Sequence, residues 1–143
     1  MLPGVLAASL FTVLSAIHCY WAFGGQWGHS SVIPEVGGKP RFCPGKSVTS
    51  LVAVLLALAA LTILGQLGLW GAALPAWLFS WGTRVISGAF FLRGIGDFRV
   101  VGLFKQVRTT RFAYWDSHLY VPLCMTVAVL ALSTSWEACN AAV

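Results

Sequence analysis

Two long stretches of this 143-residue chain, residues 1–34 and 47–83, contain no Asp, Glu, Lys or Arg. Only 9% of all residues are charged, whereas 58% are hydrophobic. A soluble domain would have about a quarter of its residues charged, and a disordered chain would be poor in apolar residues. Because roughly 20 helical residues cross a bilayer core of about 30 Å, the sequence predicts an all-α integral membrane protein.

Four segments are long and apolar enough to cross a membrane, and they predict a single domain of four transmembrane helices in an antiparallel bundle. The segments are at about residues 3–21, 48–70, 75–102 and 119–136. Pro75 suits the first turn of the third helix, where its missing N–H would have no partner. Asp116 or Ser117 is expected to cap the fourth helix.

The basic residues predict the orientation of these helices, because Lys and Arg concentrate on the cytoplasmic flanks of spans. Eight of the nine lie in the loop at about residues 22–47, or at the end of the third span and in the loop at 103–118. We therefore predict a multi-pass protein of the inner membrane, with both loops cytoplasmic and both termini outside. The net charge of +5 then reflects orientation beside anionic lipid, and no nucleic acid partner is expected.

Ionisable and aromatic side chains gather at the predicted cytoplasmic ends of the spans. Because charges are costly in a membrane, this cluster predicts a functional pocket. One of two aspartates would donate a proton, a histidine or tyrosine would be its partner, and an arginine would anchor the substrate. The candidate catalytic residues are Asp97, Asp116, His18 and Tyr120, and the candidate substrate-binding residues are Arg93, Trp21, Tyr20 and Trp115.

Structural roles compete with these chemical ones. Arg93 and Asp97 lie four residues apart in the predicted third helix, where they would form an ion pair on one face. The predicted capping role of Asp116 would also explain that carboxylate without any chemistry. His18 would be a hydrogen-bonded residue at a helix end, and Arg84 would extend towards the outer interface.

The sequence gives little support for a metal or another cofactor. No C-x-x-C or H-x-x-E-type pair is found, so no recognisable set of metal ligands exists. Cys19, Cys43 and Cys124 are expected towards the reducing cytoplasmic side and are interpreted as buried or incidental thiols. Cys139 is expected on the outer side.

Three sequence blocks occur in order along the chain. They are H-x-Y-W-A-F-G-G at residues 18–25, R-G-I-G-D-F-R-x-V-G at 93–102 and F-A-x-W-D-x-x-L-Y-x-P-L-C at 112–124. Together they resemble a family of small bacterial four-helix membrane proteins, domain of unknown function 3995. The resemblance covers nearly the whole chain and implies the four-span fold. It marks His18, Trp21, Arg93, Asp97 and Asp116 but implies no reaction.

The residue types favour an enzyme that isomerises or cyclises a lipophilic, isoprenoid-like molecule at the cytoplasmic membrane face. Membrane isomerases and cyclases place carboxylates among aromatic rings to protonate an alkene or epoxide, and this chain supplies both residue types. One alternative is a non-catalytic membrane subunit or lipid-binding accessory protein, which implies a partner subunit. Another is a transporter, which four short spans would form only as a homo-oligomer.

Overall fold

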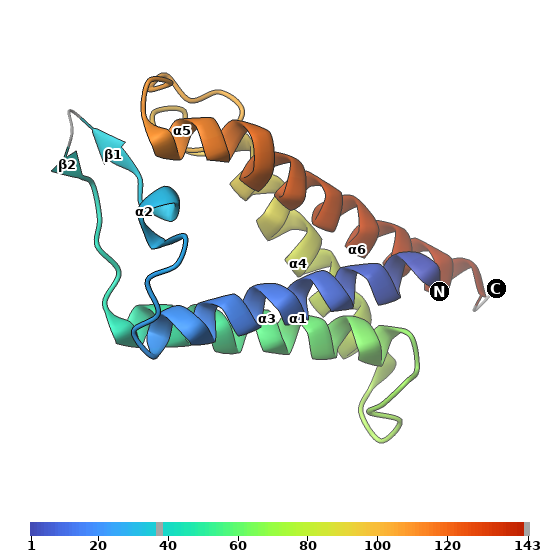
Figure 1. The fold of residues 1–143 in the computed structure, drawn as a ribbon. Helices are drawn as coiled ribbons and strands as arrows, with labels where there is room; N and C mark the ends of the chain where they lie inside the picture. Colours follow the sequence, from blue (N-terminus) through green and yellow to red (C-terminus); the bar gives the residue numbers. More distant parts are fainter. Residues whose placement is uncertain (37–38, 142–143) are drawn as a thin grey trace.

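The computed structural model describes residues 1–36 and 39–141, and its long elements are all helices (Figure 1). These are α1 (Leu2–Ala22), α3 (Lys46–Gln66), α4 (Ala76–Ile95) and α6 (Val121–Ala141). The shorter elements are α2 (His29–Val32), the antiparallel strands β1 (Glu35–Val36) and β2 (Lys39–Pro40), α5 (Arg111–Trp115) and the π-helical segment η1 (Asp116–Tyr120). The prediction of an all-α fold with four long helices is therefore confirmed for the described residues.

Three helical segments are long and apolar enough to cross a membrane, which makes the chain a membrane protein. They are Leu2–Ala22, Lys46–Gln66 and Arg111–Glu137, the last of which runs through α5, η1 and most of α6. α4 is almost as long, but it contains Arg84 and Arg93 and is not among the segments of sufficient apolar character. A crossing by α4 therefore stays a prediction.

The third long helix ends earlier than the sequence predicted, at Ile95 rather than near Gly102. Gly96, directly after Ile95, has a positive φ of +88° that turns the chain out of the helix, and Gly102 in the following loop has a φ of +96°. The chain then folds back, because the N–H of Leu103 donates to the Gly94 carbonyl at 2.9 Å. The predicted helical face shared by Arg93 and Asp97 therefore does not exist.

The last helical run begins earlier than predicted and has a different cap. Thr110 is the N-cap of α5, and its Oγ1 accepts a hydrogen bond from the N–H of Ala113 at 3.1 Å. Because the run continues from α5 into α6, Asp116 and Ser117 lie inside it. The predicted capping role of these two residues is therefore wrong.

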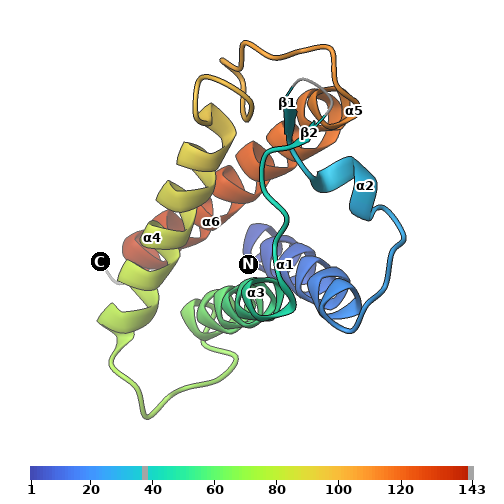
Figure 2. The same ribbon diagram turned by 90° about the vertical axis from the view of Figure 1, so that its left-hand side faces the viewer.

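The long helices form two pairs, α1 with α3 and α4 with α6, arranged as a V (Figure 1). The pairs meet near the N- and C-terminal ends of the chain, which we call the narrow end. They diverge towards α2, β1, β2 and α5, which we call the wide end, and Figure 2 shows the same separation from the side. At the narrow end, Glu137 binds the Met1 ammonium at 2.7 Å and Arg84 Nε donates to Ser135 Oγ at 3.1 Å.

The core lies where the two pairs meet, and most of its members are small. Without a hydrophobic drive between helices in lipid, small side chains stabilise packing by letting backbones approach closely. The alanines of this core surround two fully buried larger side chains, Phe11 and Ile63. The buried alanines are Ala7, Ala8, Ala59, Ala60 and Ala131.

Candidate functional site

A cavity of about 450 Å³ lies at the wide end, and we call it the apolar pocket. All four long helices, α5 and the loop between α1 and α3 contribute to its lining. Most of the lining is apolar and includes Leu14, Val52, Phe90 and Leu123; the polar or reactive side chains include His18, Trp21, Arg93, Tyr120 and Cys124. Small-molecule sites typically have volumes of about 300–1,000 Å³ and a similar mixture of apolar and polar groups.

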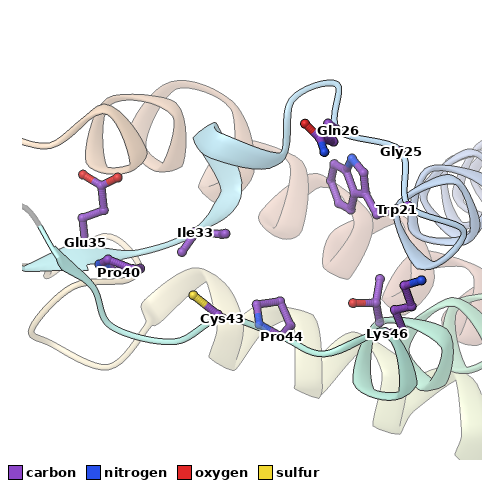
Figure 3. A pocket seen from close by; sticks show the side chains of 11 residues that line it. Trp21, Gly25, Gln26, Ile33, Glu35, Pro40, Cys43, Pro44 and Lys46 are labelled. Atoms are coloured by element: carbon purple, nitrogen blue, oxygen red, sulfur yellow. The ribbon is translucent and has the colours of Figure 1, made fainter.

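A second cavity of about 720 Å³, which we call the outer hollow, lies against the loop between α1 and α3. Figure 3 shows Trp21 and Gln26 above it, and Cys43 and Pro44 on the segment that leads to α3. Trp21, Pro44 and Thr49 line both cavities. The outer hollow therefore adjoins the apolar pocket.

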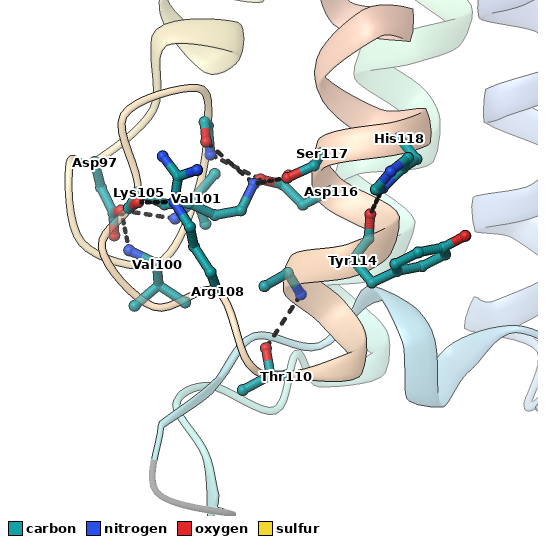
Figure 4. Close-up of polar contacts among 12 residues, drawn as sticks. Asp97, Val100, Val101, Lys105, Arg108, Thr110, Tyr114, Asp116, Ser117 and His118 are labelled. Atoms are coloured by element: carbon teal, nitrogen blue, oxygen red, sulfur yellow. Dashed lines mark hydrogen bonds and ion pairs between the residues drawn. The ribbon is translucent and has the colours of Figure 1, made fainter.

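Behind the apolar pocket lies a group of charges, Arg93, Lys105 and Asp116, which we call the charge cluster. Asp116 is fully buried, and its Oδ1 accepts a hydrogen bond from Arg93 Nη2 at 3.1 Å. Its Oδ2 accepts from Lys105 Nζ at 3.0 Å and from the N–H of Gly102 at 2.8 Å. Lys105 is only 3% exposed and also donates to Ser117 Oγ at 2.7 Å (Figure 4). The Asp116 carboxylate is thus surrounded by donors and does not line the pocket.

The π-helical segment η1 connects the charge cluster with the apolar pocket. Such segments are rare, and they occur frequently at functional sites because the extra residue in the turn changes the directions of side chains. Asp116 at the start of η1 contacts Arg93, while Tyr120 at its end lines the pocket. One irregular turn therefore serves both the charged and the apolar part of the site.

Arg93 belongs to both parts of the site. It lines the apolar pocket, and its Nη2 donates to Asp116. Its Nη1 is buried and has no hydrogen-bond partner among the described residues. Leaving a buried donor unpaired costs about 1–3 kcal/mol, and more for a charged group. A hydrogen-bond acceptor placed beside this nitrogen would remove that cost.

His18 and Tyr120 are the pocket's candidate proton-transfer groups. His18 Nδ1 lies 2.8 Å from the Leu14 carbonyl oxygen, which is only an acceptor, so Nδ1 must carry the proton. In the neutral ring, Nε2 then has the free lone pair and can accept a proton. The ring stands edge-on to Trp21 at 5.1 Å, and the Tyr120 hydroxyl donates to the Ser31 carbonyl at 3.3 Å.

Asp97 lies in the loop after α4, where it orders the backbone. Its Oδ1 accepts hydrogen bonds from three consecutive N–H groups, those of residues 99, 100 and 101, and Figure 4 shows the last two. Its Oδ2 pairs with Arg41 at 2.7 Å. Desolvation raises the pKa of this carboxyl, but the backbone donors and Arg41 outweigh it and hold the pKa below its usual range. The predicted Arg93–Asp97 ion pair is replaced by Arg93–Asp116 and Arg41–Asp97.

Two further predicted binding residues lie outside the apolar pocket. Tyr20 is exposed, and its hydroxyl accepts a hydrogen bond from the N–H of Trp27 at 3.5 Å. Trp115 is also exposed and packs edge-on against Tyr114 at 5.7 Å. Of the predicted site residues, the structure therefore brings His18, Trp21, Arg93 and Tyr120 to one pocket and places Asp116 directly behind it.

Within the part of the chain that the structure describes, no group of three or more His, Cys, Asp or Glu could hold a metal ion. Cys19 and Cys43 are free and exposed, and Cys124 is free and buried beside the pocket. The Cys139 side chain lies outside the described side chains.

Comparison with protein families gives one match, to the model described as "Protein of unknown function (DUF3995)", over residues 11–131. The chain belongs to this family. The matched region contains the sequence blocks at residues 18–25, 93–102 and 112–124, and with them every lining residue of the apolar pocket. Neither the curated proteins nor the solved structures gave a match.

Sequence reasoning missed one important residue of this DUF3995 protein, Lys105. It was interpreted as an orientation-setting charge in a cytoplasmic loop, whereas the structure buries it against Asp116. The two residues are joined through an irregular loop, and no helical or strand periodicity places them together. The sequence indicated this pair only indirectly: a carboxylate in an apolar segment, such as Asp116, requires a cation, and several cations lie near it in sequence.

Proposed function

We propose that this DUF3995 protein binds a lipophilic small molecule in the apolar pocket and isomerises or cyclises it. The observation that carries the proposal is the pocket itself, a cavity of about 450 Å³ with an apolar lining and His18, Arg93 and Tyr120 among its side chains. A lipophilic molecule enters such a cavity by exchanging contacts with lipid for contacts with these side chains. The polar groups then fix its orientation.

Within this proposal, His18 and Tyr120 are the groups that transfer protons. Isomerisation and cyclisation of alkenes both require a proton to be added or removed at carbon. His18 Nε2 can accept one, and the Tyr120 hydroxyl can give one once it has turned away from the Ser31 carbonyl. Both line the pocket, whereas Asp97 and Asp116 do not. We therefore assign proton transfer to the histidine and tyrosine, and give Asp116 the role of positioning Arg93.

We further propose that α4 is a fourth crossing and that the wide end faces the cytoplasm of an inner-membrane protein. Lys105 is buried in an ion pair and no longer counts as an orientation-setting charge. Of the eight other basic residues, all but Arg84 still lie at the wide end, in its loops, at the start of α3 or α5, or at the end of α4. The basic residues therefore remain concentrated at the wide end, which supports the proposed orientation.

A second candidate function is a lipid-binding accessory protein without catalysis. One specific observation favours it: Asp97 and Asp116 are both occupied by cations and backbone donors, so neither carboxylate reaches the pocket as a strong acid. The two candidates share the ligand site and differ in whether the bound molecule changes.

The first experiment is mass spectrometry of small molecules extracted from the protein purified in an uncharged detergent. Val52 lines the pocket, so Val52→Trp should fill it and remove the co-purified lipophile. Val54, on the same helix, is 55% exposed on the outer surface, so Val54→Trp should keep the lipophile. Absence of any defined lipophile from the wild-type protein, or equal loss in both variants, would contradict the proposed pocket.

A second measurement separates the enzyme from the accessory protein. The recovered compound is incubated with the wild-type protein and with His18→Gln, and the products are separated by chromatography. Catalysis is supported if the wild-type protein converts the compound to an isomer of equal mass and His18→Gln does not. Unchanged compound with both proteins, at equal binding, assigns the accessory role.

A further inference from the structure

The charge cluster behind the apolar pocket contains two cations and one carboxylate. Asp116 neutralises only one unit of the positive charge that Arg93 and Lys105 bring. Among the described residues, Arg93 forms no other ion pair and Lys105 is paired with Asp116 alone. The Arg93 side chain is 37% exposed, whereas Lys105 and Asp116 are at most 3% exposed, so Arg93 is the cation of this cluster that an added anion can reach.

Arg93 is the member of the charge cluster that lines the pocket and has a donor without a partner. Lys105 is 3% exposed and has three partners, namely the Gly102 carbonyl, Asp116 and Ser117. Arg93 has one partner through Nη2, whereas Nη1 is buried and unpaired. A guanidinium presents its donors as a planar fork that matches a carboxylate or phosphate.

We infer that the molecule bound in the apolar pocket is an anionic amphiphile, with a carboxylate or phosphate group on Arg93 and an apolar chain among Leu14, Val52 and Phe90. This inference rests on the proposed function, since it assigns a chemical class to the ligand of the same pocket. The anion completes the charge cluster and gives Arg93 Nη1 its missing acceptor. The apolar chain fills the remainder of the cavity.

The position of the charge cluster also explains how Arg93 is held in place. Asp116 fixes one side of the guanidinium, and Asp116 is itself held by Lys105 and the Gly102 N–H. Preorganised donors of this kind bind an anion without losing further side-chain freedom. Lys105 and Asp116 are therefore positioning residues for anion binding.

The test compares three single-chain probes of equal chain length: an alkyl carboxylate, an alkyl phosphate and the corresponding alcohol. Binding is measured by the shift in unfolding temperature of the wild-type protein in an uncharged detergent, with probe concentration varied. We expect at least one anion to bind about tenfold more tightly than the alcohol, which corresponds to one charge-assisted contact. Equal binding of alcohol and anions would overturn the inference and leave the proposed lipophile pocket standing. Absence of binding by all three would overturn both.

Substitutions of Arg93 and Arg99 test whether the anion binds at Arg93. Arg93→Gln should remove the preference for anions while keeping alcohol binding, and Arg93→Lys should retain part of it, because the charge remains and the fork is lost. Arg99 is an exposed arginine of the loop that follows α4 and does not line the pocket, so Arg99→Gln should behave as the wild type. Loss of the preference in Arg99→Gln but not in Arg93→Gln would overturn the assignment. The comparison of probes on the wild-type protein needs no variant, so it holds even if Arg93→Gln does not fold.

The anion has two sources, a membrane phospholipid or a free single-chain amphiphile, and competition distinguishes them. Nanodiscs of phosphatidylcholine alone are compared with nanodiscs that contain phosphatidylglycerol. If phosphatidylglycerol displaces the alkyl phosphate, the ligand is a lipid headgroup with its chain. If it does not, the ligand is the free amphiphile. Both results support anion binding.

Discussion

At the scale of single residues, Lys105 and Asp116 show how a membrane protein accommodates buried charge. Each is at most 3% exposed, and their atoms lie 3.0 Å apart. Removing one member of a buried ion pair leaves the other charge uncompensated. The resulting loss of stability is much larger than the net stabilisation that the pair provides. The cluster therefore behaves as a unit.

Asp116→Asn should lower the free energy of unfolding by about 3–5 kcal/mol, because Lys105 and Arg93 both lose their counter-charge. Thermal or denaturant unfolding in detergent measures this loss. Glu137→Gln is the matched control, since the Glu137 carboxylate is 51% exposed in its pair with the Met1 ammonium and should contribute at most about 1 kcal/mol. Equal stability of Asp116→Asn and the wild-type protein would show that the cluster carries no buried charge.

Asp97 gives the stability of the protein a dependence on low pH. Its pKa is lower in the folded chain than the usual value near 4, so ionised Asp97 stabilises the fold above about pH 4. That contribution is lost as the pH falls through the folded-state pKa. Asp97→Asn should therefore unfold at a lower temperature than the wild-type protein at pH 7, and the difference should shrink below about pH 4.

Arg41→Gln provides the comparison for Asp97. It removes the ion pair at 2.7 Å but keeps the three backbone N–H donors. Its effect on the unfolding temperature should be smaller than that of Asp97→Asn, because the pair is largely exposed. A larger effect would mean that the ion pair, and not the backbone hydrogen bonds, lowers the pKa of Asp97.

The roles of the aspartates could not be read from the sequence because both depended on where helices end. Spacing of four residues puts Arg93 and Asp97 on one face only if the helix continues, and it ends at Ile95. Asp116 was placed at a helix start that lies at Thr110 instead. Local spacing therefore identified the charged residues of the site but predicted the wrong partners for them.

At the scale of elements, the loop between α4 and α5 determines the shape of the site. Gly102 has φ of +96°, and a Cβ added there would collide with the backbone of Gly96 and Ile95. Its N–H also donates to Asp116. One glycine therefore allows the loop to close and supplies a donor to the charge cluster.

Gly102→Ala should lower the stability of the protein by more than about 1 kcal/mol, because alanine disfavours the positive φ and the added methyl group has no space. Gly88→Ala is the control, since Gly88 lies inside α4 with open space around its Cα. That substitution should stabilise the helix by about 0.5–1 kcal/mol. The free energy of unfolding, measured for both variants under the same conditions, should fall for Gly102→Ala and rise for Gly88→Ala. A change in the same direction for both would contradict the proposed role of Gly102.

The helical elements themselves were predictable, because a membrane leaves few alternatives to apolar helices for charge-free segments. α1 and α3 lie close to the predicted residues 3–21 and 48–70. The two helices beside the irregular loop were predicted less well. Hydropathy does not indicate where a helix ends, because it contains no information on the positive φ of Gly96 or on the capping hydroxyl of Thr110.

At the scale of the whole molecule, the apolar pocket forms because the two helix pairs separate at the wide end. The sequence predicted that His18, Arg93 and Tyr120 would lie near one membrane face, from the order and length of the helices. It did not predict which side chains converge on a cavity, because that depends on the angle between the pairs. The core where the pairs meet combines residues of α1, α3 and α6, which no local sequence pattern brings together.

Cysteine labelling tests the proposed crossing by α4. Ala73 and Gln106 are exposed residues on either side of this helix, so each is replaced by cysteine in a chain without native cysteines. A membrane-impermeant maleimide added to intact cells should label Ala73→Cys and leave Gln106→Cys unlabelled until the membrane is opened. Labelling of both from one side would show that α4 does not cross, and reversed labelling would overturn the proposed orientation.

The V shape also determines which parts of the molecule can move. The two helix pairs are joined through the backbone only by residues 67–75, at the narrow end, while contacts such as Arg41–Asp97 and Tyr120–Ser31 join them at the wide end. A helix of this length extends about 30 Å, so a tilt of about 5° around the narrow end moves the far ends by roughly 2–3 Å. A tilt of one helix pair around the narrow end would therefore change the width of the pocket mouth while every helix stays intact, and the wide-end contacts oppose such a tilt.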